Sequence, residues 1–306
     1  MKTTDMNLRA ANPKAFIHES ERDYRNQIRA AADSIYRHRN ERPIVLISGP
    51  TGAGKTTTAM LLEKYLDRAG AESTTLSMDN YFLPLTPEEN ELAKQQKIDL
   101  ETPARLDMEL LNSQLRDLME KKPVVVPKFD FVSNNRKEGE GTLIERKDDE
   151  IIILEGIHAL NPAVTGESDD FTTRIYISVR TRIADKDDVE MHPMKVRLMR
   201  RMLRDKLTRG REISGTLNML DSVKNGEDKY IMPYKYRANF EFDTFLKFEL
   251  NVYKGLLGDD VAALAKTDER LVDMARILSE LDPMSTEHIP ADSLIREFIG
   301  GSSFVY

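Results

Sequence analysis

A glycine-rich turn near the start of the sequence has the composition of a phosphate-binding site. Residues 49–56 read GPTGAGKT, which matches the pattern G-x-x-x-x-G-K-[ST]. Glycines in such a turn let backbone N–H groups face phosphate oxygens, while the lysine reaches the β- and γ-phosphates and the hydroxyl binds Mg²⁺. We therefore predict a nucleotide site, with Lys55 also acting in catalysis and Thr56 on the metal. The predicted nucleotide-binding residues are Gly49, Pro50, Thr51, Gly52, Ala53, Gly54, Lys55, Thr56 and Thr57.

Two acidic residues follow segments that we predict to be strands. Glu155 comes directly after the apolar run 151–154, and Asp79 comes directly after the segment 73–78. The carboxyl ends of parallel strands meet at one edge of a sheet, where α/β proteins bind their ligands. Glu155 is predicted to hold Mg²⁺, and Asp79 to accept a proton from an attacking hydroxyl. The alternatives are a strand-end acid that faces water and a turn-forming aspartate.

A basic segment forms the third candidate. Residues 193–211 carry eight lysines and arginines although the whole chain has a net charge of -7. Arginines that close over a nucleotide stabilise the charge of the transferred phosphoryl group and exclude water. Because the local charge opposes that of the chain, we interpret the segment as a lid over the site; the alternative is a solvated helix face.

Strands and helices alternate around these residues. Short apolar runs at 44–47, 151–154 and 174–179 predict buried parallel strands, and 55–68, 107–120 and 193–211 predict helices. Residues 124–146 predict a β-rich excursion, 240–246 an edge strand and 271–281 a closing helix. The fold class is α/β: a P-loop NTPase with three α/β/α layers, a mostly parallel sheet, a small β-rich acceptor-binding excursion and a helical lid.

Three parts of the chain follow from these elements. Residues 1–42 are predicted to be an N-terminal helical extension, because Tyr24, Ile28, Ala31 and Ile35 recur at helical spacing. Residues 43–258 form the predicted kinase core, with the lid at about 185–212. Residues 259–306 are predicted to be a C-terminal helical extension packed on that core.

Composition narrows the setting. The chain has 306 residues, 40% of them hydrophobic, which is enough for a packed core. It has no cysteine, no apolar run of 18 residues and no secretory signal, so we expect a cytoplasmic protein without membrane partners. The acidic balance argues against a nucleic-acid partner. The histidines, including His158, lack metal-ligand spacing and are expected to be structural.

Together these segments resemble the uridine kinase branch of the phosphoribulokinase/uridine kinase family. The resemblance covers roughly residues 43–301. The matching strings are GPTGAGKTT at 49–57, SMDNYF at 77–82, DLETPARLD at 99–107, FDFVSNNR at 129–136, LEGIHAL at 154–160, RRMLRDKLTRGR at 200–211 and the terminal IPADSLIREFIGG. The resemblance implies an enzyme that transfers the γ-phosphate of ATP, with Mg²⁺, to the ribose 5′-hydroxyl of a nucleoside, with uridine or cytidine as first candidates.

The resemblance also implies individual roles. Asp79 would be the base that takes the proton of the 5′-hydroxyl. Glu101, where the family usually has aspartate, would bind the ribose hydroxyls together with Arg201. The predicted acceptor-binding residues are Asp79, Phe82, Glu101, Phe129, Asn134, Arg136 and Arg201, and the predicted lid arginines on the phosphates are Arg204, Arg209 and Arg211, of which Arg204 and Arg211 are predicted to be catalytic.

Two departures leave the acceptor open. The histidine and glutamine that read the pyrimidine in this family fall on Asn134 and Met219. A site that loses its base-reading hydrogen bonds loses its specificity for that base. A different small polyol or sugar-containing alcohol is therefore the alternative acceptor. A GTPase switch would need an Asn-Lys-x-Asp string, which is absent, and a nucleic-acid-stimulated ATPase would need aromatic residues within a basic patch. The sequence does not decide whether the phosphate donor is ATP or GTP, or whether the protein forms a homo-oligomer.

Overall fold

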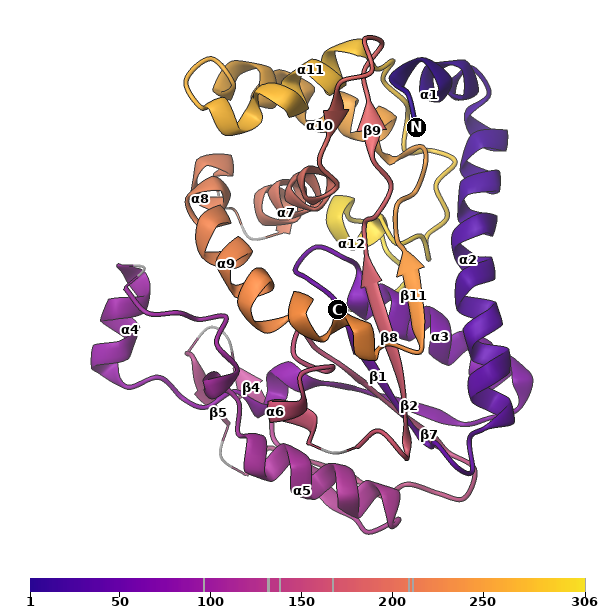
Figure 1. Ribbon diagram of the computed structural model, residues 1–306, viewed down its shortest axis with the longest axis vertical. Coiled ribbons are helices and arrows are strands. Elements are labelled where there is room, and N and C mark those ends of the chain that lie inside the picture. The colour runs from indigo at the N-terminus through magenta and orange to yellow at the C-terminus, as the bar shows by residue number, and fades with distance from the viewer. Residues whose placement is uncertain are drawn as a thin grey trace.

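The computed structural model describes residues 1–95, 97–130, 133–137, 139–166, 168–208, 210 and 212–305. Its centre is a five-stranded parallel sheet with the strand order β11-β8-β1-β7-β2. The strands are β1 (Ile44–Ser48), β2 (Ser73–Ser77), β7 (Ile151–Glu155), β8 (Thr172–Ser178) and β11 (Phe240–Asp243). Each of these strands was predicted from the sequence, and β11 lies at an edge of the sheet as expected (Figure 1).

Two hydrophobic cores cover the two faces of this sheet. Side chains alternate along a strand, and in β1 Val45 and Ile47 enter one core while Ile44 and Leu46 enter the other. The first core includes α2 (Pro13–Arg37), α3 (Lys55–Ala69) and α7 (Met194–Thr208); the second includes α5 (Met108–Met119) and α6 (Pro162–Thr165). The three-layer α/β/α fold predicted from the sequence is therefore confirmed.

The remaining helices surround these layers. They are α1 (Thr3–Ala10), α4 (Pro87–Lys94), α8 (Ile213–Asn218), α9 (Leu220–Tyr230), α10 (Glu249–Leu264), α11 (Val272–Glu280) and α12 (Arg296–Ile299), with 3₁₀ turns at η1 (Met78–Tyr81), η2 (Pro103–Arg105), η3 (Met232–Arg237) and η4 (Glu269–Leu271). Within the described part of the chain, no helix combines the length and apolar character needed to cross a membrane.

The predicted β-rich excursion consists of two small antiparallel ladders. β3 (Val124–Val126) pairs with β6 (Thr142–Ile144), and β4 (Phe129–Asp130) pairs with β5 (Asn135–Arg136). The turn between β4 and β5 contains Asn134 in the left-handed region, at φ 52°, which asparagine tolerates better than most residues. A third ladder, β9 (Ile183–Ala184) with β10 (Glu190–Met191), precedes α7.

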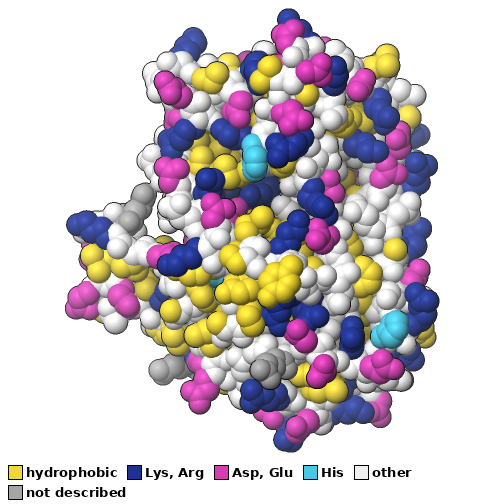
Figure 2. Space-filling view, viewed as in Figure 1, with side chains coloured by type: hydrophobic (Ala, Val, Ile, Leu, Met, Phe, Trp, Pro, Cys, Tyr) yellow, Lys and Arg dark blue, Asp and Glu magenta, His cyan; other side chains and the backbone are white. Residues whose placement is uncertain are grey.

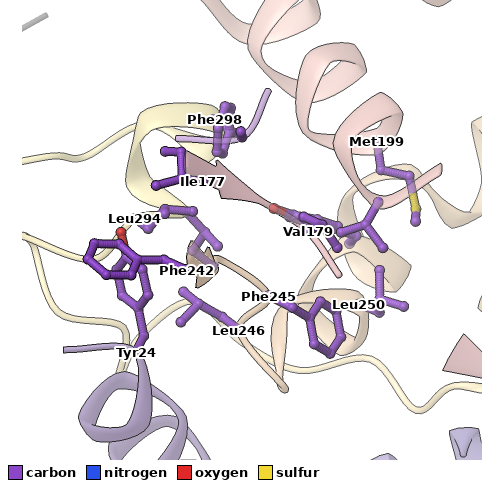
Figure 3. Close-up of a cluster of buried hydrophobic side chains, with 14 of the residues drawn as sticks. Tyr24, Ile177, Val179, Met199, Phe242, Phe245, Leu246, Leu250, Leu294 and Phe298 are labelled. Atoms are coloured by element: carbon purple, nitrogen blue, oxygen red, sulfur yellow. The ribbon is translucent and has the colours of Figure 1, made fainter. Parts of the chain in front are cut away.

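The N-terminal and C-terminal extensions both pack onto the core that carries the central sheet. The apolar positions predicted to face the core, Tyr24, Ile28, Ala31 and Ile35, are all buried in α2, which runs along one side of the molecule (Figure 1). From the opposite end of the chain, Leu294 and Phe298 enter the same cluster as Tyr24 (Figure 3). The domain boundaries themselves stay a prediction.

Acidic and basic side chains are mixed over the surface. Figure 2 shows lysines and arginines interspersed with aspartates and glutamates across the face in view, together with an apolar area on its lower left. Much of the basic segment of the sequence does not contribute to this surface, because several of its arginines are buried.

Candidate active site

The glycine-rich turn forms the connection between β1 and α3. Gly52 and Gly54 have φ angles of 77° and 87°, a conformation that side chains with a Cβ rarely adopt. Gly54 is the N-cap of α3 and supplies no side-chain cap. The first N–H groups of this helix therefore have no capping side chain, and the helix dipole favours an anion at this end. This arrangement fits a phosphate group.

Glu155 and Asp79 lie at the same edge of the sheet as the turn. In the register of the sheet Glu155 pairs with Ile47 of β1 on one side and with Ser77 of β2 on the other. The Ser77 hydroxyl donates to Glu155 Oε1 at 3.0 Å and accepts from the Asp79 N–H at 3.4 Å. The two acids are thus linked through Ser77, a residue that the sequence did not single out.

Lys55 is the common electrostatic partner of these acids. Burial raises the pKa of Asp79, and the Lys55 ammonium opposes the rise. Burial likewise raises the pKa of Glu155; Lys55 opposes this rise, while the Asp79 carboxylate adds to it. A buried pair of like charges beside one lysine favours a bound proton or a bound cation. The site therefore suits a divalent cation that arrives together with phosphates.

The residues present fit magnesium. Mg²⁺ in phosphotransferases is typically held by one or two protein oxygens together with the phosphates of the nucleotide and water. Thr56 and Glu155 would supply such oxygens, since Thr56 lies in the first turn of α3 and Glu155 ends β7. Over the described residues, no group of three or more histidine, cysteine, aspartate or glutamate side chains could hold a metal by itself.

Glu101 and Arg201 influence each other electrostatically, and Lys55 also acts on Glu101. The Arg201 side chain is 6% exposed. Burial raises the pKa of Glu101 to about 6, opposed by the charges of Arg201 and Lys55. Burial also lowers the pKa of Arg201, opposed by Asp205 and Glu101. Gly226 of α9 lets the chain approach closely, because a Cβ there would lie 2.4 Å from Glu101 Cβ. The pair predicted to bind ribose is therefore brought together.

The two predicted phenylalanines also meet. The rings of Phe82 and Phe129 pack edge to face with centroids 5.7 Å apart. Arg136 has its guanidinium bound within the protein: it donates to the carbonyls of Tyr81 and Phe82 and to Asp107 Oδ2 at 2.9–3.1 Å. Arg136 thus holds the chain just after Asp79, and direct contact with the acceptor stays a prediction.

The family position for base reading is occupied by a hydrogen-bonded amide. Asn134 donates from Nδ2 to Asn90 Oδ1 at 3.2 Å. Met219 lies at the junction of α8 and α9. His158, expected to be structural, is buried against Tyr230 with ring centroids 6.1 Å apart, and burial lowers its pKa to about 4.

The basic helix α7 is only in part what we predicted. Arg197 and Arg200 are buried and ion-paired with Glu227 and Glu249, so these two residues belong neither to a mobile lid nor to a solvated face. They also donate to carbonyls of the glycine-rich turn, at Thr51 and Gly52. Arg204 is one-fifth exposed, with Asp205 at 3.8 Å. Arg209 and Arg211 lie outside the described residues, so their lid role stays a prediction.

Sequence reasoning also missed the residues behind the turn. The Tyr24 hydroxyl lies 2.7 Å from Thr58 Oγ1, which in turn donates to the Gly54 carbonyl. Glu297 accepts a hydrogen bond from Thr57. These partners are far apart in sequence, and the sequence predicted only that a C-terminal extension packs on the core.

Comparisons with known proteins agree with this geometry. The Phosphoribulokinase / Uridine kinase family matches residues 44–248. A uridine kinase from Halobacterium salinarum is 31% identical over 194 residues, 63% of this chain and 76% of the relative. A uridine kinase from Lactobacillus johnsonii is 32% identical over 65% of this chain and 86% of the relative. Uridine-cytidine kinase 2-B of Danio rerio is 29% identical over 66% of this chain and 73% of the relative.

The fold and the site thus define a P-loop kinase, a phosphotransferase that acts on a hydroxyl group. The chain belongs to the phosphoribulokinase/uridine kinase family, as its sequence motifs predicted.

Proposed function

We propose that this protein is an ATP-dependent nucleoside kinase that phosphorylates the ribose 5′-hydroxyl of a uridine- or cytidine-like nucleoside. The observation that carries the proposal is the convergence of three groups at one sheet edge. The uncapped N-terminus of α3 with Lys55, the strand-end Glu155 and the half-buried Asp79 each influence one another electrostatically. Donor phosphates, metal and acceptor hydroxyl each have a matching group.

Each residue then has a defined task. Lys55 binds the β- and γ-phosphates, and Asp79 accepts the proton of the attacking hydroxyl, a role typically worth about 10² to 10⁴ in rate. Thr56 and Glu155 would hold Mg²⁺, which offsets charge on the phosphates when bound. The predicted lid arginines, Arg204, Arg209 and Arg211, would stabilise the charge on the transferred group.

The acceptor side follows from the pairs described above. Glu101 and Arg201 would orient the ribose hydroxyls, and the edge-to-face pair of Phe82 and Phe129 would contact the nucleoside. The protein is proposed to act in the cytoplasm on small molecules, without nucleic-acid or membrane partners.

A second acceptor class is supported by one observation. Asn134 occupies the position that reads the pyrimidine in the family, and it donates one of its two amide N–H groups to Asn90 Oδ1. Without the histidine and glutamine that read the pyrimidine in the family, the site has less means to reject an alcohol that lacks a pyrimidine. A small polyol or a sugar-containing alcohol is therefore the alternative acceptor.

The test is a phosphotransfer panel. ATP consumption is measured with uridine, cytidine, purine nucleosides, sugars and polyols, and the phosphorylated product is identified by mass and by the position of the phosphate. A 5′-monophosphate of a nucleoside supports the proposal. Turnover with sugars or polyols and none with any nucleoside would defeat it in favour of the alternative. A variant with Lys55→Ala controls for contaminating kinases.

A further inference from the structure

The C-terminal segment from Ile289 to Gly301 lies directly against the phosphate-binding turn, although the family comparison matches only residues 44–248. Leu294 and Phe298 are fully buried. A Cβ added at Gly54 would lie 2.6 Å from Leu294 Cδ1, so the segment packs on the N-cap of α3 itself. In Figure 3 Leu294 and Phe298 lie with Ile177 and Phe242 near the ends of the central strands.

One polar contact joins this segment to the first turn of α3. The Thr57 hydroxyl donates to Glu297 Oε2 at 2.6 Å, and the Thr57 side chain is fully buried. A hydroxyl has one proton to donate, so Thr57 cannot give it to the carboxylate and to a phosphate oxygen at the same time. A donor phosphate at this helix end would therefore compete with Glu297.

The charge of Glu297 also reaches the predicted magnesium site. Burial is the main cause of the raised pKa of Glu155, and the Glu297 carboxylate adds to it. Glu297 is thus a fixed negative charge close to where the donor phosphates would bind, which is the reverse of what a phosphate site ordinarily presents.

The segment is anchored independently of Glu297. Asp292 accepts from Lys64 Nζ at 2.7 Å and from Arg25 Nη2 at 2.8 Å, which ties the segment to α3 and α2. Arg296 donates to the carbonyls of Thr286 and Ile289 at 2.9 Å. Replacing Glu297 therefore removes one contact while the segment stays in place.

We propose that Glu297 is a positioning residue of the donor site, which holds the Thr57 hydroxyl away from the donor phosphates and thereby lowers the affinity for the donor nucleotide. This inference rests on the proposed function, since it takes the turn to be the ATP site. It assigns the C-terminal segment a role in setting donor affinity. Entry of the nucleotide requires exchange of the Thr57–Glu297 hydrogen bond for a Thr57–phosphate bond.

The experiment measures the dissociation constant of ADP with Mg²⁺ by calorimetry in full-length variants. Glu297→Ala removes the competing acceptor and should tighten MgADP binding about tenfold, the effect expected of a hydrogen bond to a charged group. Glu297→Gln keeps a weaker, neutral acceptor and should lie between wild type and Glu297→Ala. The KM for ATP should fall in the same order, while kcat changes less. Glu287→Gln, at an exposed position two residues before this segment, serves as the matched control.

A second background tests the route. In a Thr57→Val protein the hydroxyl is gone, so adding Glu297→Ala should change the affinity for MgADP less than about twofold. Tightening of the same size in both backgrounds would overturn the proposal, because the effect would then come from charge alone. Unchanged or weaker binding in Glu297→Ala, with the melting temperature of wild type, would also overturn it. If wild type and Glu287→Gln bind no MgADP, the proposed function itself fails.

Discussion

Replacing Arg200 by methionine should destabilise the protein strongly, because this arginine forms a buried ion pair with Glu249. Its side chain and that of Glu249 are both 0% exposed, and they are joined by two contacts, at 2.8 and 2.9 Å. Removing one partner of a buried pair leaves the other charge uncompensated, at a cost of about 3–5 kcal/mol. For a chain of this size each kcal/mol lowers Tm by roughly 2–4 °C, so we expect a fall of roughly 6–20 °C.

The neighbours of the pair refine this expectation. Arg200 also donates to the Gly52 carbonyl at 3.1 Å and to the Thr244 carbonyl at 2.6 Å. Glu249 keeps two donors of its own, the Tyr253 hydroxyl and the Leu246 N–H. A double variant, Arg200→Met with Glu249→Gln, also removes the unpaired negative charge of Glu249 and should recover at least half of the lost stability. Both variants should bind MgADP more weakly than wild type, because both lack the Arg200 hydrogen bond to the Gly52 carbonyl in the glycine-rich turn.

The assay is thermal unfolding followed by circular dichroism, with MgADP binding measured on the same proteins. Lys206→Met on the same helix is the control: its ion pair with Asp260 is exposed on both sides, so its removal should change stability by less than about 1 kcal/mol. Melting of Arg200→Met within 2–3 °C of wild type, or a double variant no more stable than the single one, would refute the reasoning.

Three further outcomes are expected. Lys55→Ala should weaken MgADP binding at least about tenfold and also lower kcat, since the proposed contact of Lys55 with the phosphates would form in both ground and transition states; titration calorimetry and initial rates decide this. Arg204→Ala and Arg211→Ala should each lower kcat more than they change the KM of the acceptor, and normal kcat in both would remove the lid assignment. Glu155→Gln should abolish Mg²⁺-dependent turnover yet stabilise the free protein at pH 8. Burial holds the Glu155 pKa above its ordinary value of 4.5, so the folded wild type binds more protons than the unfolded chain and loses stability as pH rises from about 4.5. The variant lacks this loss, and the difference in unfolding free energy should grow from near zero at pH 4 to the order of 1–3 kcal/mol at pH 8. A constant difference across this range would contradict the assignment.

Local patterns predicted the parts of the fold that depend on neighbouring residues. The apolar run 44–47, the glycine turn after it and the helix that begins at Lys55 are contiguous, so one stretch of sequence specifies all three. Glu155 and Asp79 could be placed for the same reason, since Glu155 ends β7, Asp79 lies two residues after the end of β2, and parallel strands share one edge.

Long-range pairing explains what the sequence did not reveal. A run of arginines reads alike whether its side chains face water, a nucleotide or the interior. Arg200 acquires its structural role through Glu249 and the carbonyls of Gly52 and Thr244, and Thr57 meets Glu297 only because the two ends of the chain enclose the turn. No sequence period or motif encodes such contacts, which exist only in the folded structure.

The most direct measurement of the central claim is the single-turnover rate of phosphoryl transfer in Asp79→Asn, made with saturating MgATP and the best acceptor of the panel. The account predicts a fall of at least about 10²-fold with the affinity for MgADP within a few-fold of wild type, because the change removes a proton acceptor and leaves the phosphate-binding turn intact. An unchanged rate would contradict it.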